Sequence, residues 1–136
     1  MIAFRGRVFM ARILLVDDDQ EMAYSTKTAL VMHGYEVVVF HEARPAIEEA
    51  KNKIPDLILM DMMMPQFTGA EAIKELKKIP QLARVPVIIL TGLLTPEEYL
   101  DMTRIAVDGK VYKTLCKPYK IDELIKAVSE SLKWSH

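Results

Sequence analysis

Five side chains that are able to do chemistry together each follow a short apolar run of the sequence. They are Asp17, Asp18, Asp61, Thr91 and Lys117. Carboxylates that lie close together repel one another, and burial strengthens this repulsion, so a positive charge must lie among them or one carboxyl must hold a proton. Lys117 supplies one positive charge, and a hard cation such as Mg²⁺ supplies two while it keeps several waters. A carboxylate nucleophile, a metal ion, a lysine and a hydroxyl are the groups that phosphoryl transfer needs.

Asp61 ends the most regular of these runs. Four apolar residues, Leu57 to Met60, precede it, and Pro65 follows four residues later. A short, unbroken apolar run bounded by prolines indicates a strand that is buried on both faces. Ligands of open parallel sheets bind at the edge where such strands end. We therefore expect Asp61 to lie at a binding edge.

Five apolar segments predict strands, and five segments with helical spacing of apolar residues alternate with them. The predicted strands are 12–16, 35–40, the run from Leu57 to Asp61, 85–90 and 111–116. The predicted helices are 20–33, the segment between Pro45 and Pro55, the segment between Gly69 and Pro80, 95–107 and 121–133. This alternation predicts an α/β domain with one doubly wound parallel sheet, right-handed crossovers and helices on both faces. The usual strand order at this size is 2-1-3-4-5, the flavodoxin-like arrangement.

The predicted strand order explains how distant residues meet. The first and third strands are neighbours in it, so Asp17, Asp18 and Asp61 converge at one edge of the sheet. Thr91 and Lys117 end the fourth and fifth strands and lie beside them. The sequence thus predicts one site built from four strand ends.

The fourth predicted helix rests on its end signals. Residues 95–98 read Thr-Pro-Glu-Glu, a capping-box pattern with proline at the first helical position. Gly109 supplies the stop signal, so we expect a helix from Thr95 to about Val107. The strand that follows is predicted more weakly, because Lys113 interrupts its apolar run.

Composition restricts the classes of protein to which the chain can belong. The chain has 136 residues, of which 51% are hydrophobic, and its formal net charge is −1. We expect one domain over residues 11–136, with residues 1–10 as a loose extension. The balanced charge, without a basic cluster between aromatic residues, argues against intrinsic nucleic-acid binding. The single cysteine, Cys116, excludes a disulfide framework, and no apolar run approaches the roughly 18 residues of a membrane span, so we expect a cytoplasmic protein that does not bind membranes.

The site residues together resemble the receiver domain of two-component response regulators. The resemblance extends from Arg12 to about Lys133. Its motifs are Val16-Asp17-Asp18-Asp19 after the first strand, Met60-Asp61 with Pro65 and Gly69 four and eight residues beyond Asp61, Thr91 followed by a small residue, and Lys117-Pro118. Each motif alone is common, whereas all of them in order at strand ends are specific.

The resemblance implies a role for each site residue. Asp61 is expected to be the phosphoacceptor, and Asp17, Asp18, Asp61 and the backbone carbonyl of Met63 are expected to bind Mg²⁺. Thr91 is expected to hydrogen-bond the phosphoryl group and Lys117 to pair with it, with a cis Lys117–Pro118 bond. The family also implies a sensor histidine kinase or a histidine phosphotransfer protein as the donor. We expect a stand-alone signalling switch that is not an enzyme beyond its own phosphorylation and dephosphorylation, and that passes its signal to an effector protein through the face of the fourth helix, fifth strand and fifth helix.

The chain departs from the family pattern at an activation residue. Family members often carry an aromatic residue three positions before the lysine, where this chain has Thr114. Tyr112 lies two residues earlier, on the same face of the strand and about 7 Å away along it, so it is a candidate substitute. Whether Tyr112 modulates the site is left open.

Two apolar residues are expected to flank the mouth of the site. Met63 and Leu93 lie two residues beyond Asp61 and Thr91, where the family tunes hydrolysis of the phosphoryl group. Neither side chain can orient a water by hydrogen bonding, and both can shield an acyl phosphate. The resemblance therefore predicts slow self-dephosphorylation.

Two other functions are compatible with parts of the sequence. The domain can serve as a shuttle in a phosphorelay. Asp17-Asp18-Asp19 also contains the Asp-x-Asp that opens haloacid-dehalogenase-type phosphatases, with Asp17 as nucleophile. That second alternative is disfavoured because Glu21 departs from its pattern and Asp61 is left without a task. The three histidines share no metal-ligand spacing, and the sequence assigns them no function.

Overall fold

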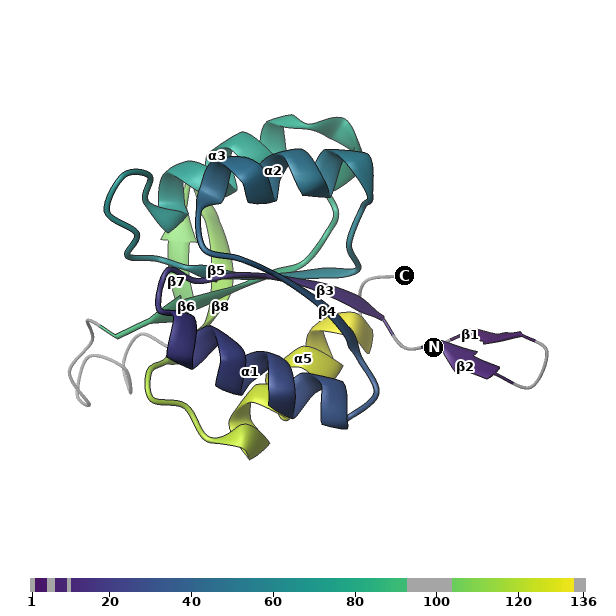
Figure 1. The fold of residues 1–136 in the computed structure, drawn as a ribbon. Helices are drawn as coiled ribbons and strands as arrows, with labels where there is room; N and C mark the ends of the chain where they lie inside the picture. Colours follow the sequence, from purple (N-terminus) through teal and green to yellow (C-terminus); the bar gives the residue numbers. More distant parts are fainter. Residues whose placement is uncertain (1, 5–6, 10, 93–103, 134–136) are drawn as a thin grey trace.

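A six-stranded sheet lies between two layers of helices (Figure 1). The computed structural model describes residues 2–4, 7–9, 11–92 and 104–133. The strands of the sheet are β3 (Arg12–Val16), β4 (Glu36–Phe40), β5 (Leu57–Asp61), β6 (Val87–Thr91), β7 (Arg104–Val107) and β8 (Lys110–Cys116). The helices are α1 (Gln20–Met32), α2 (Ala43–Asn52), α3 (Gly69–Lys78) and α5 (Ile121–Lys133), with a 3₁₀ turn η1 (Pro80–Leu82). Helices α2 and α3 cover one face of the sheet, and α1 and α5 cover the other.

The strand order confirms the predicted doubly wound topology. The sheet runs β4-β3-β5-β6-β8-β7, and the first five strands in this order pair in parallel. In chain order those five strands give 2-1-3-4-5. Strands β3 and β5 are therefore neighbours, and their carboxyl ends lie at the same edge.

The central strands are buried on both faces, which explains their unbroken apolar sequences. Alternate side chains of β3 point to opposite sides: Leu14 packs with the residues of α2 and α3, and Leu15 packs with those of α1 and α5. Both are at most 1% exposed. Burying one such side chain contributes about 1.5–3 kcal/mol. The core thus holds the strand ends that carry the site.

The far edge of the sheet differs from the prediction. Residues 104–107 form strand β7, which pairs antiparallel with β8, whereas we expected them to end a helix. The rest of that predicted helix, up to residue 103, lies outside the described residues, and four of the five predicted helices are described. Strand β8 also begins at Lys110 and continues through Lys113 without interruption.

A two-residue turn explains this correction. Asp108 and Gly109 connect β7 to β8 with φ values of 53° and 81°. Positive φ at both central residues is the geometry of the tight hairpin turn that Asp-Gly favours, because its twist matches that of the two strands. Gly109 therefore turns a hairpin rather than ending a helix. Val107 and Tyr112, on either side of the turn, are buried in the core on the α3 side.

The first ten residues contain a small sheet of their own. Strands β1 (Ile2–Phe4) and β2 (Arg7–Phe9) pair antiparallel, with Ile2 opposite Phe9. They are not part of the six-stranded sheet. The boundary between the extension and the domain at residues 10 and 11 stays a prediction. Across the described part of the chain, no helix has both the length and the apolar character needed to cross a membrane.

Candidate functional site

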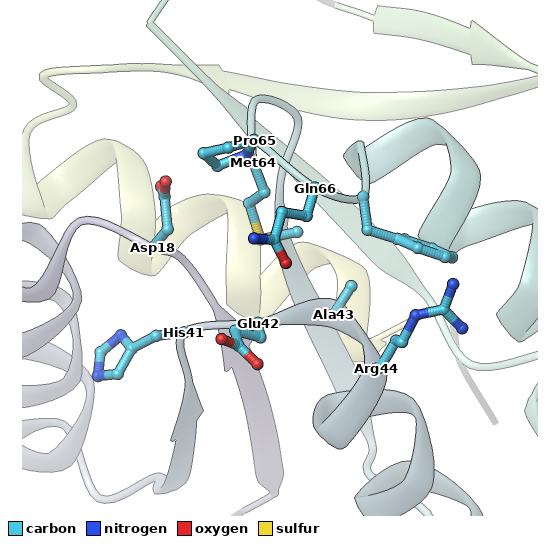
Figure 2. Close-up of a pocket in the computed structure, with 9 residues that line it drawn as sticks. Asp18, His41, Glu42, Ala43, Arg44, Met64, Pro65 and Gln66 are labelled. Carbon is cyan, nitrogen blue, oxygen red and sulfur yellow. The ribbon is translucent and has the colours of Figure 1, made fainter.

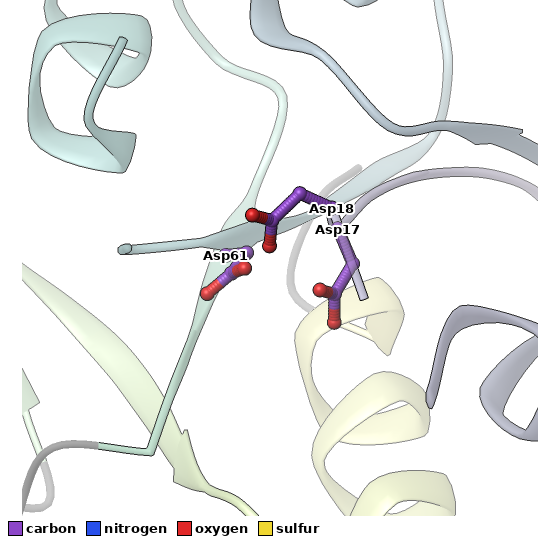
Figure 3. Close-up of side chains that lie close together, drawn as sticks. All are labelled: Asp17, Asp18 and Asp61. Carbon is purple, nitrogen blue, oxygen red and sulfur yellow. The ribbon is translucent and has the colours of Figure 1, made fainter. Parts of the chain in front are cut away.

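Three carboxylates meet where β3 and β5 end. Asp17 and Asp18 follow β3, and Asp61 is the last residue of β5 (Figure 3). One oxygen from each carboxylate lies within 4.8 Å of the other two. Asp17 and Asp61 are buried, whereas Asp18 is exposed. The structure thus brings together the three acids that the sequence placed at this edge.

Hydrogen bonds from neighbouring segments fix the position of Asp17. Its backbone N–H donates to the carbonyl of Phe40, at the end of β4, over 3.0 Å. Its carboxylate oxygen Oδ1 accepts the backbone N–H of Asp19 at 3.0 Å. Asp19 in turn caps α1, since its own carboxylate accepts the N–H of Met22. The start of α1 and the end of β4 therefore hold the first acid of the site.

Asp61 is a carboxylate in an unfavourable position for its charge. Its side chain is only 4% exposed, and its oxygen Oδ1 accepts the backbone N–H of Met63 at 3.2 Å. Burial and then the nearby charge of Asp17 together raise the pKa of Asp61 to about 7, against the opposing effects of the Met63 N–H and Lys117. A cation bound at this edge would offset much of the free-energy cost of ionising Asp61 there.

Lys117 reaches both buried acids. Its ammonium Nζ lies 2.8 Å from Asp17 Oδ2 and 3.5 Å from Asp61 Oδ2. Burial alone would lower the pKa of Lys117, but the hydrogen bond and charge of Asp17 and the charge of Asp61 outweigh it and raise the pKa. The backbone N–H of Lys117 donates to the carbonyl of Thr91 at 2.7 Å, which joins the ends of β6 and β8. The Lys117–Pro118 bond is cis, as predicted.

Thr91 completes this edge of the sheet. It is the last residue of β6 and is 3% exposed, and it pairs with Cys116 of β8. Asp61 pairs with Leu90, the residue before Thr91. The sheet register therefore sets the hydroxyl-bearing residue and the two acids at one level along the strands.

A close approach of α3 explains the glycine eight residues beyond Asp61. The backbone N–H of Gly69 donates to the carbonyl of Met62 at 3.0 Å. A Cβ at Gly69 would lie 2.4 Å from the backbone oxygen of Asp61 and 2.7 Å from the Cα of Met62. Thr68 and Glu71 form a capping box that starts α3 at this point. Only glycine lets the helix start so close to the backbone that carries Asp61.

The donor set suits a hard divalent cation. Its ligand atoms are all oxygens, which Mg²⁺ and Ca²⁺ prefer, and the exposed Asp18 leaves one side open for waters. Lys117 alone leaves the cluster with excess negative charge, because three carboxylates share one ammonium. The residues present therefore fit a metal ion. The predicted ligation by the backbone carbonyl of Met63 stays a prediction.

A cavity of about 260 Å³ opens beside the acids (Figure 2). Its lining includes Asp18, His41, Glu42, Arg44, Met64 and Phe67. The guanidinium of Arg44 lies over the ring of Phe67, 4.8 Å from the ring centre. The cavity thus lies between the loop after Asp61 and the loop after β4, and Asp18 is the member of the acid cluster that lines it.

The structure does not bring Tyr112 to this site. Lys113 pairs with Ile88, whereas Thr91 pairs with Cys116, so Tyr112 lies near the start of β6 and far from its end. Its side chain is buried on the α3 side of the sheet. Thr114, which is also buried, donates its hydroxyl to the carbonyl of Tyr112 at 3.3 Å. The modulating role of Tyr112 stays a prediction, and Leu93 lies outside the described residues.

Sequence reasoning missed one residue at the site. His41 follows β4, and its ring nitrogen Nδ1 lies 2.8 Å from the backbone carbonyl oxygen of Asp17. The sequence assigns His41 no function on spacing alone, because the three histidines share no metal-ligand spacing. The signal that was available is its position, one residue past the end of the strand beside β3.

Comparisons with known proteins agree with this geometry. Residues 13–129 match the sequence model of the response regulator receiver domain. The chain is 34% identical to the chemotaxis protein CheY of Bacillus subtilis over 122 residues, which are 89% of this chain and 97% of that protein. It is also 34% identical to the transcriptional regulatory protein CpxR of Escherichia coli over 93% of this chain, but it spans only 51% of that protein. The solved structure of the chemotaxis protein CheY4 of Vibrio cholerae has a TM-score of 0.77 and 30% identity, with coverage of 90% of this chain and 98% of that one.

Proposed function

Because this chain belongs to the response regulator receiver domain family and is a phosphorylation-activated switch of two-component signalling, we propose that Asp61 is the residue that accepts the phosphoryl group. The observation that carries this proposal is the position of Lys117 between two buried acids, 3.5 Å from Asp61 and 2.8 Å from Asp17. In a structural ion pair one acid would suffice for one lysine. Here the lysine lies where the added charge of an acyl phosphate would develop.

The chemistry of the transfer follows from the groups at the edge. A carboxylate oxygen of Asp61 attacks the phosphorus of a phosphohistidine, a new O–P bond forms and the P–N bond breaks. The released nitrogen keeps the electron pair of that bond, and the histidine leaves as a neutral imidazole because its other ring nitrogen already carries a proton. The ammonium of Lys117 and the hydroxyl of Thr91 bind the phosphoryl oxygens. Asp61 must be ionised to attack, so its raised pKa has to be lowered in the reacting complex.

Mg²⁺ is the proposed cofactor. Asp17, Asp18, Asp61 and the backbone carbonyl of Met63 would hold it, and it would supply the positive charge that keeps Asp61 ionised and neutralises the incoming phosphoryl oxygens. The all-oxygen donor set supports this choice. The hydrogen bonds of Asp17 with Asp19 and Phe40 would hold this proposed ligand in place before the metal ion binds.

The partners follow from the same chemistry. We propose a sensor histidine kinase or a histidine phosphotransfer protein as donor, and an effector protein that contacts β8, α5 and the predicted fourth helix. The protein would act in the cytoplasm and would catalyse only its own phosphorylation and dephosphorylation. A phosphorelay shuttle would use the same site and would differ only in the receiving partner.

Intact mass spectrometry after incubation with acetyl phosphate and Mg²⁺ tests the proposal. We expect a gain of one phosphoryl group in the wild type and no gain in Asp61→Asn. Omission of Mg²⁺ is expected to abolish the gain as well. Labelling that persists in Asp61→Asn and disappears in Asp17→Asn would contradict the proposal and favour phosphatase-type chemistry at Asp17.

A further inference from the structure

His41 binds the backbone between the two acids that follow β3. Its Nδ1 lies 2.8 Å from the carbonyl oxygen of Asp17, in the loop that joins β4 to α2. A carbonyl oxygen only accepts hydrogen bonds, so Nδ1 carries the proton and donates it. The preceding residue, Phe40, accepts the N–H of Asp17 at 3.0 Å. Two consecutive residues of one segment thus hold Asp17 by both of its backbone polar groups.

We propose that His41 is a positioning residue for the metal-binding acids. The inference rests on the proposed function, because it assigns His41 a task in the Mg²⁺ site. His41 itself is not a ligand in this proposal. It acts through the backbone of Asp17.

The planarity of the peptide bond makes this contact effective. The carbonyl of Asp17 belongs to the peptide group that links Asp17 to Asp18, and this group is rigid and flat. A hydrogen bond to its oxygen therefore restricts the backbone rotations on its two sides, ψ of Asp17 and φ of Asp18, which set the directions in which the two side chains leave the backbone. The Asp17 side chain is fully buried, whereas Asp18 is exposed, and within the described residues its carboxylate forms no hydrogen bond or ion pair. His41 thus limits the rotation that would move the Asp18 carboxylate away from the other two.

The energetic argument concerns repulsion between the acids. Three carboxylates with oxygens within 4.8 Å of each other share only the ammonium of Lys117, so part of their repulsion is not offset and favours separation when no divalent cation is bound. If the carboxylates have moved apart, bringing them together again when the cation binds costs free energy, and this cost weakens the affinity for the cation. Residues that orient metal ligands from behind typically change metal affinity 10–100-fold when they are removed. His41 contacts the backbone rather than a ligand atom, so we expect a smaller change of about threefold to tenfold.

The chain contains a matched control. His33, at the end of α1, makes the same kind of contact: its Nδ1 lies 2.9 Å from the carbonyl oxygen of Ala29. This contact closes a helix end and touches none of the three acids. Replacing His33 therefore removes an equivalent hydrogen bond without disturbing the site.

The experiment measures Mg²⁺ affinity of the full chain by isothermal titration calorimetry. His41→Leu is expected to raise the dissociation constant for Mg²⁺ about threefold to tenfold. His41→Asn is expected to recover most of the affinity, because its amide N–H lies the same number of bonds from the backbone as Nδ1. His33→Leu is expected to leave the affinity unchanged.

The outcomes separate this inference from the proposed function. Unchanged affinity in His41→Leu, or an equal loss in His33→Leu, overturns the positioning role even when Asp61 is phosphorylated normally. A loss confined to His41→Leu supports the role even when acetyl phosphate fails to label Asp61, a failure that would overturn only the proposed function. If His41→Leu fails to fold, His41→Ala and His41→Gln take its place. His41→Ala, which lacks a hydrogen-bond donor, is then expected to show the weakened Mg²⁺ affinity.

Discussion

The two halves of the sheet differ in how their strands are connected and in which site residues they supply. In the half made of β4, β3 and β5, all strands are parallel, and α1 and α2 make the crossovers between them. In the half made of β6, β8 and β7, the last pair is an antiparallel hairpin closed by Asp108 and Gly109. The first half supplies the three acids, and the second half supplies Thr91 and Lys117. One half would therefore bind the metal, and the other would bind the phosphoryl group.

Packing is also tighter in the first half. Gly69, eight residues beyond Asp61, lies against the backbone of Asp61 and Met62, with no room for a Cβ. Gly92 follows Thr91, and among the described residues a Cβ there would come nearest to the Cβ of Lys117, at 3.7 Å. The acid-bearing backbone is thus held by a helix start, whereas the Thr91 side has ordinary contacts. The difference indicates that the backbone of Asp61, the proposed phosphoacceptor, is packed more tightly than the backbone after Thr91.

The largest effect should come from a methyl group added to each of these glycines. Gly69→Ala places a Cβ 2.4 Å from the carbonyl oxygen of Asp61, so α3 or the end of β5 must move. We expect the free energy of unfolding to fall by about 3 kcal/mol, at the upper end for overpacked sites. Gly92→Ala is expected to change it by less than about 0.5 kcal/mol, since its contacts are ordinary. Urea unfolding of both variants measures the difference.

Equal losses of unfolding free energy in Gly69→Ala and Gly92→Ala would contradict the conclusion that the first half is packed more tightly. A loss in Gly92→Ala alone would reverse it. Both substitutions replace glycine by alanine close to the end of a site strand, Gly69 at the start of α3 and Gly92 directly after β6, so the difference reports local packing more than the general cost of replacing glycine.

The next effect is a gain of stability when the buried charge is removed. The pKa of Asp61 is raised from its ordinary value of 3.8 to about 7, so the folded protein binds this proton more tightly than the unfolded chain does. The contribution of Asp61 to stability is therefore expected to fall as the pH rises from about 4 to about 7. Asp61→Asn has no such charge, so without divalent cations it should exceed the wild type by about 2 kcal/mol at pH 8, a value discounted for partial solvation and for Lys117.

The pH dependence of that gain is the sharper measurement. Denaturation in EDTA at several pH values should show the advantage of Asp61→Asn growing between pH 4 and pH 7 and staying level above that. Asp18→Asn removes an exposed acid from the same cluster and should give a clearly smaller gain. A gain for Asp61→Asn that does not depend on pH would contradict a buried, repelled carboxylate.

How far the sequence predicts the molecule also differs between the halves. The runs before Asp17 and Asp61 are apolar because both faces of their strands are buried, so pattern alone locates these strand ends. The end of the predicted fourth helix was wrong because Gly109 was interpreted as a helix stop without its partner Asp108. Asp-Gly between the alternating residues of 104–107 and 110–116 is a hairpin signal that the sequence does contain.

Contacts between distant segments were harder to predict. The bond from His41 to Asp17 and the clash-free start of α3 at Gly69 depend on how two loops pack in three dimensions. No periodicity encodes them. Side-chain composition shows which residues are available for a site, but the orientation of its backbone appears only in the fold.

The hairpin turn gives the third effect. Gly109 has a φ of 81°, a conformation that is strained for a residue with a Cβ, and a Cβ placed there would meet no atom of the described residues within 4 Å beyond its own chain neighbours. Gly109→Ala should therefore lower the free energy of unfolding by about 1 kcal/mol through backbone strain alone. Gly109→Asn should lower it less, because asparagine adopts this conformation more readily. Equal stability of all three proteins in urea would contradict the turn that ends the second half of the sheet.

The smallest effect concerns the two residues at equivalent positions in the two halves. Met63 lies two residues beyond Asp61, and its side chain is 50% exposed while its backbone N–H holds the Asp61 carboxylate. Leu93 lies two residues beyond Thr91. Met63→Asn adds a group that orients water near the acyl phosphate, and Leu93→Glu does the same from the other half. Each is expected to shorten the lifetime of the phosphorylated protein about threefold, which corresponds to about 0.7 kcal/mol in the barrier.

Decay of the label after acetyl phosphate is removed, followed by intact mass, measures these lifetimes. Gly109→Asn serves as the control, because it alters the chain far from the strand ends that carry the site. Because the backbone around Asp61 is tightly packed, Met63→Asn should change only the hydrolysis of the acyl phosphate by water and leave the rate of phosphorylation unchanged. A shorter lifetime in Leu93→Glu but not in Met63→Asn would assign control of hydrolysis to the half that holds Thr91 and Lys117. Unchanged lifetimes in both variants would refute the prediction that these apolar residues slow the loss of the phosphoryl group.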